Sequence, residues 1–158
     1  MLQESHCEAA FPGGEVPDWF DYHSTNSSIS LEVASRLCGK PVDCFFGAVV
    51  ELDKAAKATG MLHCGCEIVI SDHRTWFLEK YLGSLESSHV WLTKIKFNCL
   101  TWPFNNMRYW NNFEVSFRIS QVSSKEKLKA TLKSCGLHII CKQQGYQIDQ
   151  TLVRKCVG

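Results

Sequence analysis

The feature that most constrains the fold of this chain is an alternation of apolar and polar residues that recurs along it. Side chains of a β-strand point to opposite faces in turn, so this period predicts strands with one buried and one exposed face. The more continuously apolar stretch 42–52 predicts a central strand that is covered on both faces. The alternating segments are 28–33, 62–70, 113–119 and 135–141. Residues 89–97 also have the pattern of a strand.

Helical patterns are few and short. Residues 54–58 predict a single turn of helix, and residues 124–133 a short helix with Ser124 as its N-cap. Neither is long enough to cover a sheet, and antiparallel strands without crossover helices bury their apolar faces by packing sheet on sheet. We therefore predict an all-β fold, an antiparallel β-sandwich with six or seven strands and at most one or two short helices, as a single domain over residues 1–158.

The composition is that of an ordinary globular protein, with 45% hydrophobic and 21% charged residues. No apolar run approaches the roughly 20 residues of a membrane-spanning helix. The first residues lack the basic and apolar regions of a secretory signal, so we expect none. We predict no membrane partner.

Charge is distributed unevenly along the chain. Residues 1–79 carry 5 basic and 12 acidic side chains, whereas residues 80–158 carry 12 basic and 4 acidic ones. Basic residues alternate with apolar ones in the second half, as in Lys94-Ile95-Lys96-Phe97, which is typical of strands rather than of a basic tail. We expect strands from the two halves to interleave and largely cancel the imbalance, and we predict no nucleic-acid partner.

The nine cysteines show no regular spacing. Without an export signal they are expected to be reduced thiols, many of them buried as small hydrophobic residues. Cys64 and Cys66, two apart on a predicted strand, would point to the same face and are the best candidate metal ligands. That face continues with Ile68 and Ile70, which favours a core position over a zinc site.

Sequence motifs of common enzymes are missing. The chain has no phosphate-binding P-loop, no Gly-x-Gly-x-x-Gly, no Gly-x-Ser-x-Gly and no His-Glu-x-x-His. We therefore predict a non-enzymatic protein with no catalytic residues, no cofactor and no metal.

Residues 99–112 are the best candidate for a partner-binding loop. Pro103 and four asparagines predict a loop, and its large side chains are of the types that dominate binding hot spots. The same aromatics would alternatively close one end of the sandwich, or stack on sugar rings as in a lectin-like carbohydrate-binding β-sandwich. The candidate binding residues are Trp102, Phe104, Arg108, Tyr109 and Trp110.

The segment 11–20 combines two prolines and two glycines with three aromatic residues. Proline and glycine exclude a regular helix there. The aromatic side chains of Phe11, Trp19 and Phe20 are expected to anchor this turn-rich segment by packing.

The same segment, with further motifs in order, resembles the C-terminal jelly-roll/Ig-like domain that follows the leucine-rich repeats in plant TIR-type NLR disease-resistance proteins. The motifs cover about residues 9–142. They are Phe11–Phe20, Ser27–Leu31, Phe46–Val50, His89–Leu92, Phe113–Phe117 and Lys133–His138. The resemblance implies that Pro12, Pro17 and Trp19 shape the first connection, and that Trp91 and Phe117 lie in the core.

The resemblance further implies a recognition domain of an intracellular immune receptor, with the cytoplasm as its expected location and the nucleus as a second one. Its expected partners are a pathogen effector protein and the leucine-rich repeats of the same or a related receptor. The chain carries no TIR domain, no nucleotide-binding domain and no leucine-rich repeats, so NAD cleavage and nucleotide binding are not expected of it.

Overall fold

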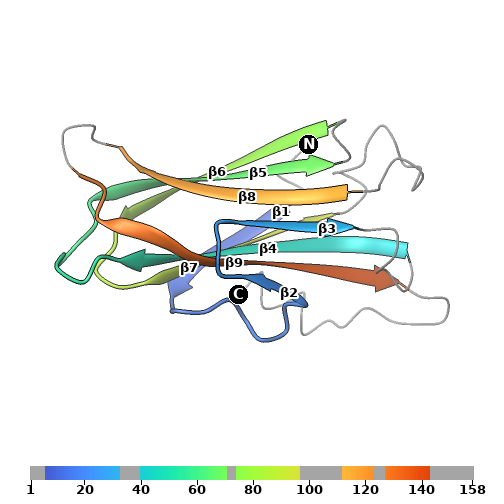
Figure 1. Cartoon of the computed structure of the whole chain (residues 1–158), viewed down its shortest axis with the longest axis horizontal. Helices are drawn as coiled ribbons and strands as arrows, with labels where there is room; N and C mark the ends of the chain where they lie inside the picture. Colours follow the sequence, from blue (N-terminus) through green and yellow to red (C-terminus); the bar gives the residue numbers. More distant parts are fainter. Residues whose placement is uncertain (1–5, 33–39, 71–73, 97–111, 123–126, 143–158) are drawn as a thin grey trace.

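A computed structural model describes residues 6–32, 40–70, 74–96, 112–122 and 127–142, which form two antiparallel sheets packed as a sandwich (Figure 1). The predicted all-β sandwich is thereby confirmed. Among these residues, no helix has the length and hydropathy needed to span a membrane. The strands are β1 (His6–Pro12), β2 (Tyr22–Ser24), β3 (Ser28–Glu32), β4 (Lys40–Leu52), β5 (Met61–Ile70), β6 (Arg74–Ser84), β7 (His89–Lys96), β8 (Asn112–Gln121) and β9 (Ala130–Lys142).

The two sheets interleave strands from both halves of the sequence. The five-stranded sheet has the order β1-β7-β4-β9-β2, and the four-stranded sheet has the order β3-β8-β5-β6. The acidic first half of the chain and the basic second half therefore share both sheets, as their alternating patterns predicted. The longest strands, β4 and β9, pair with each other near the middle of the larger sheet.

All six predicted strands are present, and three more, β1, β2 and β6, were not predicted. The helix predicted over residues 124–133 is wrong for its described part, because Ala130 to Lys133 belong to β9, where Leu132 pairs with Val50 of β4. Ladder hydrogen bonds to a long neighbouring strand outweigh a weak helical pattern. Residues 54–58 form turns and bends, with the Ala56 N–H donating to the Asp53 carbonyl (3.0 Å).

The main core lies between the two sheets. Phe46 of the larger sheet stacks on Phe113 of the smaller one, and Trp91 meets Phe117 edge to face; in both pairs the ring centroids are 6.0 Å apart. Such aromatic pairs add to the stabilisation from apolar burial. Trp91 and Phe117 are buried, so their predicted core positions are confirmed.

A second, smaller core covers the outer face of the five-stranded sheet. Residues 13–21, called the ribbon below, cross this face and bury Val16 and Phe20 against it. With Trp19 partly buried beside them, the sheet residues of this cluster are Phe45, Val49, Val90, Leu92 and Ile140. Every residue from Asp43 to Val50 in β4 is therefore buried, which confirms the prediction of a strand covered on both faces.

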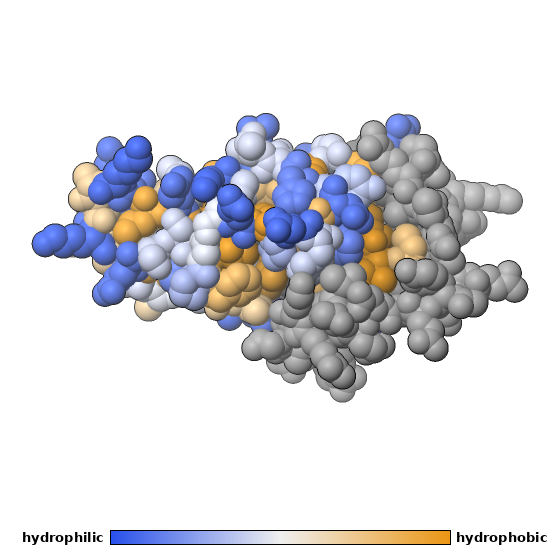
Figure 2. Space-filling model, turned by 90° about the horizontal axis from the view of Figure 1, so that it is seen from below, coloured by the Kyte–Doolittle hydropathy of each residue, from blue (hydrophilic) through white to orange (hydrophobic). Residues whose placement is uncertain are grey.

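The ribbon is fixed by turns and hydrogen bonds as well as by packing. The Phe20 N–H donates to the Pro17 carbonyl (3.1 Å), and the Lys133 ammonium donates to the Gly14 carbonyl (3.2 Å). Trp19 and Phe20 are the anchors expected from the sequence, whereas Phe11 is 37% exposed at the end of β1. Figure 2 views the molecule from the side where the ribbon and β2 lie, and there hydrophobic residues show only as patches between hydrophilic ones.

Two glycines make room for the ribbon on the sheet. A Cβ atom on Gly136 of β9 would lie 2.6 Å from Val16 Cγ1 and 2.8 Å from Phe20 Cδ2. A Cβ on Gly47 of β4 would lie 2.8 Å from Leu92 Cδ2 and 3.3 Å from Phe20 Cε2. Phe20 therefore sits in a shallow depression that only these missing side chains create.

His138 of β9 lies beneath the ribbon in an aromatic cluster. Its ring centroid is 5.2 Å from that of Trp19, 6.0 Å from that of Phe20 and 6.1 Å from that of Phe45. Burial lowers the pKa of His138, and the Asp21 carboxylate, whose Oδ2 lies 3.1 Å from Nδ1, offsets only part of that effect. Burial beneath the ribbon therefore disfavours the charged form of this imidazole.

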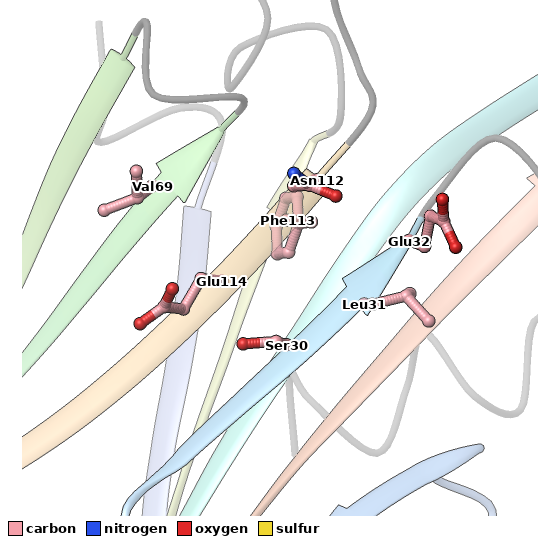
Figure 3. Close-up of a pocket in the computed structure, with 7 residues that line it drawn as sticks. All are labelled: Ser30, Leu31, Glu32, Val69, Asn112, Phe113 and Glu114. Atoms are coloured by element: carbon pink, nitrogen blue, oxygen red, sulfur yellow. The ribbon is translucent and has the colours of Figure 1, made fainter.

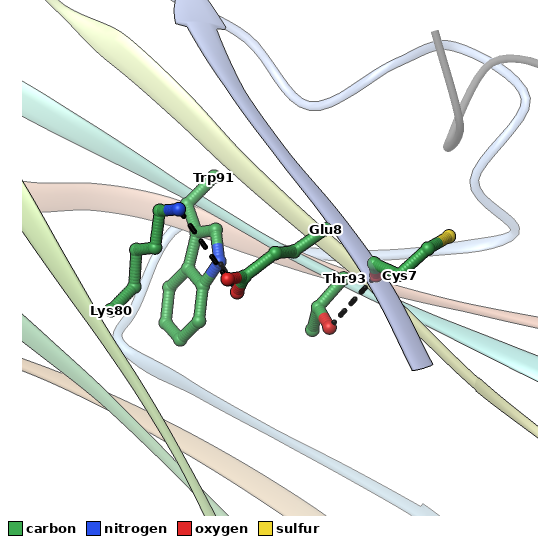
Figure 4. A network of polar contacts seen from close by, with 5 residues as sticks. All are labelled: Cys7, Glu8, Lys80, Trp91 and Thr93. Carbon is green, nitrogen blue, oxygen red and sulfur yellow. Dashed lines mark hydrogen bonds and ion pairs between the residues drawn. The ribbon is translucent and has the colours of Figure 1, made fainter. Parts of the chain in front are cut away.

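The open side of the sandwich between β1 and β6 is bridged by a polar network (Figure 4). The Glu8 carboxylate of β1 lies 3.4 Å from the Lys80 ammonium of β6 and accepts a hydrogen bond from the buried Trp91 indole N–H at 3.4 Å. Beside it, the Thr93 hydroxyl donates to the Cys7 carbonyl (3.2 Å). An inward-pointing lysine of this kind discourages another strand from adding to the edge.

We predict that Gly136→Ala destabilises the domain by about 1–3 kcal/mol, because the new methyl group forces Val16 and Phe20 off the sheet. Urea unfolding measures this difference. The matched control is Gly83→Ala in β6, where no atom lies within 4 Å of the added Cβ, and the expected change is within about 0.5 kcal/mol. An equal loss of stability in the two variants would contradict the fit of the ribbon into the space that Gly136 leaves.

We also predict that stability falls on acidification below about pH 6.5, the ordinary histidine range. Because the pKa of His138 is lower in the folded protein, the unfolded chain binds the proton first, and its binding draws the equilibrium towards unfolding. Urea unfolding between pH 5 and pH 8 measures how the free energy of unfolding changes with pH. This pH dependence should be smaller in His138→Gln and unchanged in the control His89→Gln. An unchanged pH dependence in His138→Gln would contradict the role given to His138.

Candidate functional site

The ends of six strands lie together at one end of the sandwich, called the loop end below. β3, β5 and β7 end there, and β4, β6 and β8 begin there, at the right of Figure 1. The pairing registers place these strand ends together, since Glu32 pairs with Asn112 and Ile70 pairs with both Arg74 and Phe113. Connections that cluster at one end of a rigid sandwich are the usual place for binding residues.

The partner-binding residues predicted from the sequence belong to the connection 97–111, which lies outside the described residues. These residues are Trp102, Phe104, Arg108, Tyr109 and Trp110, and their role stays a prediction. The strands on either side of the connection are described, with Lys96 ending β7 and Asn112 beginning β8. Both strand ends lie at the loop end.

A recess of about 380 Å³ opens beside Asn112 at the loop end (Figure 3). Ser30, Glu114 and Val69 line it in one row across β3, β8 and β5, because Glu114 pairs with Ser30 on one side and with Val69 on the other. The remaining lining residues are Leu31, Glu32, Asn112 and Phe113. Leu31 and Phe113 are buried, so the recess has an apolar base and a polar rim.

The described lining of the recess is negative. Glu32 and Glu114 are both exposed, and there is no lysine, arginine or histidine among the lining residues that the structure describes. Such a rim suits amide donors or basic side chains of a partner, whereas it repels phosphate and other anions. Within the described chain, no group of three or more His, Cys, Asp or Glu residues is arranged to hold a metal ion.

The outer face of the four-stranded sheet carries a second group of binding-type residues. Phe77 and Tyr81 of β6 are 54% and 64% exposed. The Arg118 guanidinium of β8 lies 5.8 Å from the Phe77 ring centroid, and the His63 ring of β5 lies 4.8 Å from that of Tyr81. His63 Nε2 also lies 3.4 Å from the Glu79 carboxylate.

Sequence reasoning missed this group because β6 inverts the usual alternation. The aromatic residues Phe77 and Tyr81 point outwards, while Lys80 points to the inner side beside the buried Cys64. Hydrophobic periodicity therefore gave no strand there. The sequence signal that could have revealed β6 was the pair Leu78 and Leu82. Both are buried, and residues four apart on a strand point to the same face.

Cys64 and Cys66 both lie in the main core, as the apolar continuation of their strand favoured. Burial raises the pKa of Cys64 to about 11 and that of Cys66 further above its ordinary value. Burial likewise raises the pKa of Cys135, in the facing sheet, to about 11. Thiols of this kind are poor nucleophiles and poor metal ligands, since both roles need the thiolate.

A family model described as the C-JID domain matches residues 11–145 of the chain. A comparison with curated proteins finds no match. The matched range includes the ribbon, strands β2 to β9 and the whole of the connection 97–111.

We predict that Cys64, Cys66 and Cys135 resist alkylation in the folded protein. A rise of about two units in the pKa lowers the thiolate fraction about a hundredfold at pH 8, and burial blocks access as well. Mass spectrometry after iodoacetamide treatment measures the modification of each residue. Cys7, which is partly exposed, is the internal control and should react before these three; rapid modification of Cys66 in the folded protein would contradict its place in the core.

Proposed function

Because the chain belongs to the C-JID family, the C-terminal domain that follows the leucine-rich repeats of TIR-type NLR proteins, we propose that it recognises a pathogen effector for a plant immune receptor. Recognition here means non-covalent binding of the effector protein. Its consequence is a change in how the rest of the receptor assembles.

The observation that carries this proposal is that six strand ends meet beside a recess at the loop end. The recess rim, formed by Ser30, Glu32, Asn112 and Glu114, adjoins the start of β8, where the connection with the predicted binding residues returns to the sheet. Aromatic and arginine side chains beside a polar rim form the usual composition of a protein-binding hot spot. Connections also tolerate sequence change better than strands do, which suits a surface that must follow a changing effector.

The direction of the first strand supports cooperation with the repeats. β1 begins at the loop end, because His6 pairs with Ile95 near the end of β7. Repeats that precede the domain in the proposed receptor would approach it at this end. An effector held by the repeats would meet the recess and the connection 97–111 without crossing the length of the sandwich.

The proposed activity needs neither catalysis nor a cofactor. The described cysteines of the core are protonated, and the described lining residues of the recess include no histidine, lysine or cysteine that would act as a base or nucleophile. We propose the cytoplasm as its location, with the nucleus as a second one, and an effector and the leucine-rich repeats as its partners. Nucleic acid and membranes are not among the partners that we propose.

We predict that replacing Trp102, Tyr109 and Trp110 together by alanine weakens effector binding at least about tenfold, because such residues dominate protein interfaces. Glu114→Lys should also weaken it by reversing the charge of the recess rim. The measurement is pull-down and cell death in leaves that express the whole receptor with candidate effectors.

The control variant is Glu86→Lys, an exposed residue between β6 and β7 at the opposite end of the sandwich, which should leave binding unchanged. All variants must accumulate to the same level. Effector binding that survives the triple alanine variant would refute this choice of surface.

A further inference from the structure

The two outer faces of the sandwich are covered unequally. The ribbon and its small core cover the five-stranded sheet, whereas no described segment lies across the four-stranded sheet. Five large hydrophobic residues of the described chain are exposed, and four of them belong to the four-stranded sheet or to its ends: Met61, Phe77, Tyr81 and Val122. Grouped exposure of this kind marks an interaction surface more often than isolated exposure does.

The centre of this face is shaped by a glycine. Gly65 of β5 pairs with Arg118 on one side and with Glu79 on the other. A Cβ on Gly65 would lie 3.3 Å from both Cγ and Nε of Arg118, so the missing side chain lets the arginine lie flat across β5 towards Phe77. The guanidinium has no ion pair within 4 Å among the described residues. It is held by its stem and by the aromatic ring.

Acidic residues surround this centre. By the pairing registers and the strand alternation, the outer face carries four carboxylates and one guanidinium, that of Arg118, with His63 beside Glu79. The four acidic residues are Glu32, Glu67, Glu79 and Glu114. The face is therefore negative around an aromatic middle.

We propose that this outer face, called the bare face below, is a second interaction surface that docks a protein surface on which lysine or arginine side chains surround an apolar contact. Phe77 and Tyr81 supply the apolar contact, and the glutamates select a basic partner by charge. The surface is separate from the residues proposed to bind the effector, apart from the recess rim that Glu32 and Glu114 share with it.

Charge complementarity distinguishes this partner from other classes. A nucleic acid or an anionic membrane would be repelled by four carboxylates. A neutral glycan would stack on Phe77 and Tyr81 but would gain nothing from the surrounding charges. Exposed carboxylates contribute mainly to the rate and selectivity of association, while the aromatic residues supply most of the affinity.

The probe for this proposal is a short synthetic peptide in which lysine and tyrosine alternate, with a second peptide carrying glutamate at every lysine position. Amide chemical shifts of the labelled 158-residue protein map the contact, and calorimetry gives the Kd. We expect the lysine peptide to shift resonances of β5, β6 and β8 on the bare face, with a Kd that rises with salt. The glutamate peptide should not bind.

Variants separate the two contributions. Phe77→Ala combined with Tyr81→Ala should raise the Kd at least about tenfold, and Glu67→Gln about threefold. Both aromatic residues are exposed, so this variant keeps the core intact. The matched control is Glu15→Gln, an exposed carboxylate on the ribbon, which should leave the Kd unchanged.

Three results would overturn the proposal. One is equal binding of the two peptides, and another is a shift pattern centred on the ribbon or the loop end. The third is binding of a soluble glucan that is lost in Tyr81→Ala, without binding of the lysine peptide, which would make the face a carbohydrate site. Effector binding by the whole receptor should persist in the Phe77/Tyr81 variant, so failure of this proposal is distinguishable from failure of the proposed function.

Discussion

The fold depends on the need to cover the five-stranded sheet on both of its faces. The middle of β4, from Asp43 to Val50, is buried throughout, so apolar side chains such as Phe45 and Phe46 point in opposite directions from neighbouring positions. The four-stranded sheet covers one face and the ribbon covers the other. A ribbon without regular secondary structure performs this task because Val16 and Phe20 fit the depression left by Gly47 and Gly136.

The sequence predicted the strands whose residues alternate in polarity and the one strand that is apolar on both faces. Alternation located strands such as β5 and β8, and the continuous apolar run located β4 as a strand with two buried faces. It missed β6, because the solvent-facing side of this strand carries aromatic residues. Its inward-facing side carries Lys80, which pairs with Glu8. The sequence also predicted a helix where β9 begins, because a local pattern carries no information on the pairing of Leu132 with Val50, about 80 residues away.

The candidate sites were predictable to different degrees. The composition of the connection 97–111 predicted a binding loop, with closure of one end of the sandwich by the same aromatics as the alternative. The recess and the bare face depend on register instead. Ser30, Glu114 and Val69 come from three strands, as do Phe77, Gly65 and Arg118, and only the pairing of those strands brings them together.

The position of the ribbon has a consequence for the order in which the domain is made. The ribbon lies near the start of the chain, yet its seat includes Gly136 and His138 of β9, the last described strand. During synthesis the ribbon therefore has no complete binding surface until β9 has left the ribosome. Contacts so distant in sequence are slow to form. In a receptor whose leucine-rich repeats precede this domain, the ribbon would therefore take its seat only after the repeats have been made.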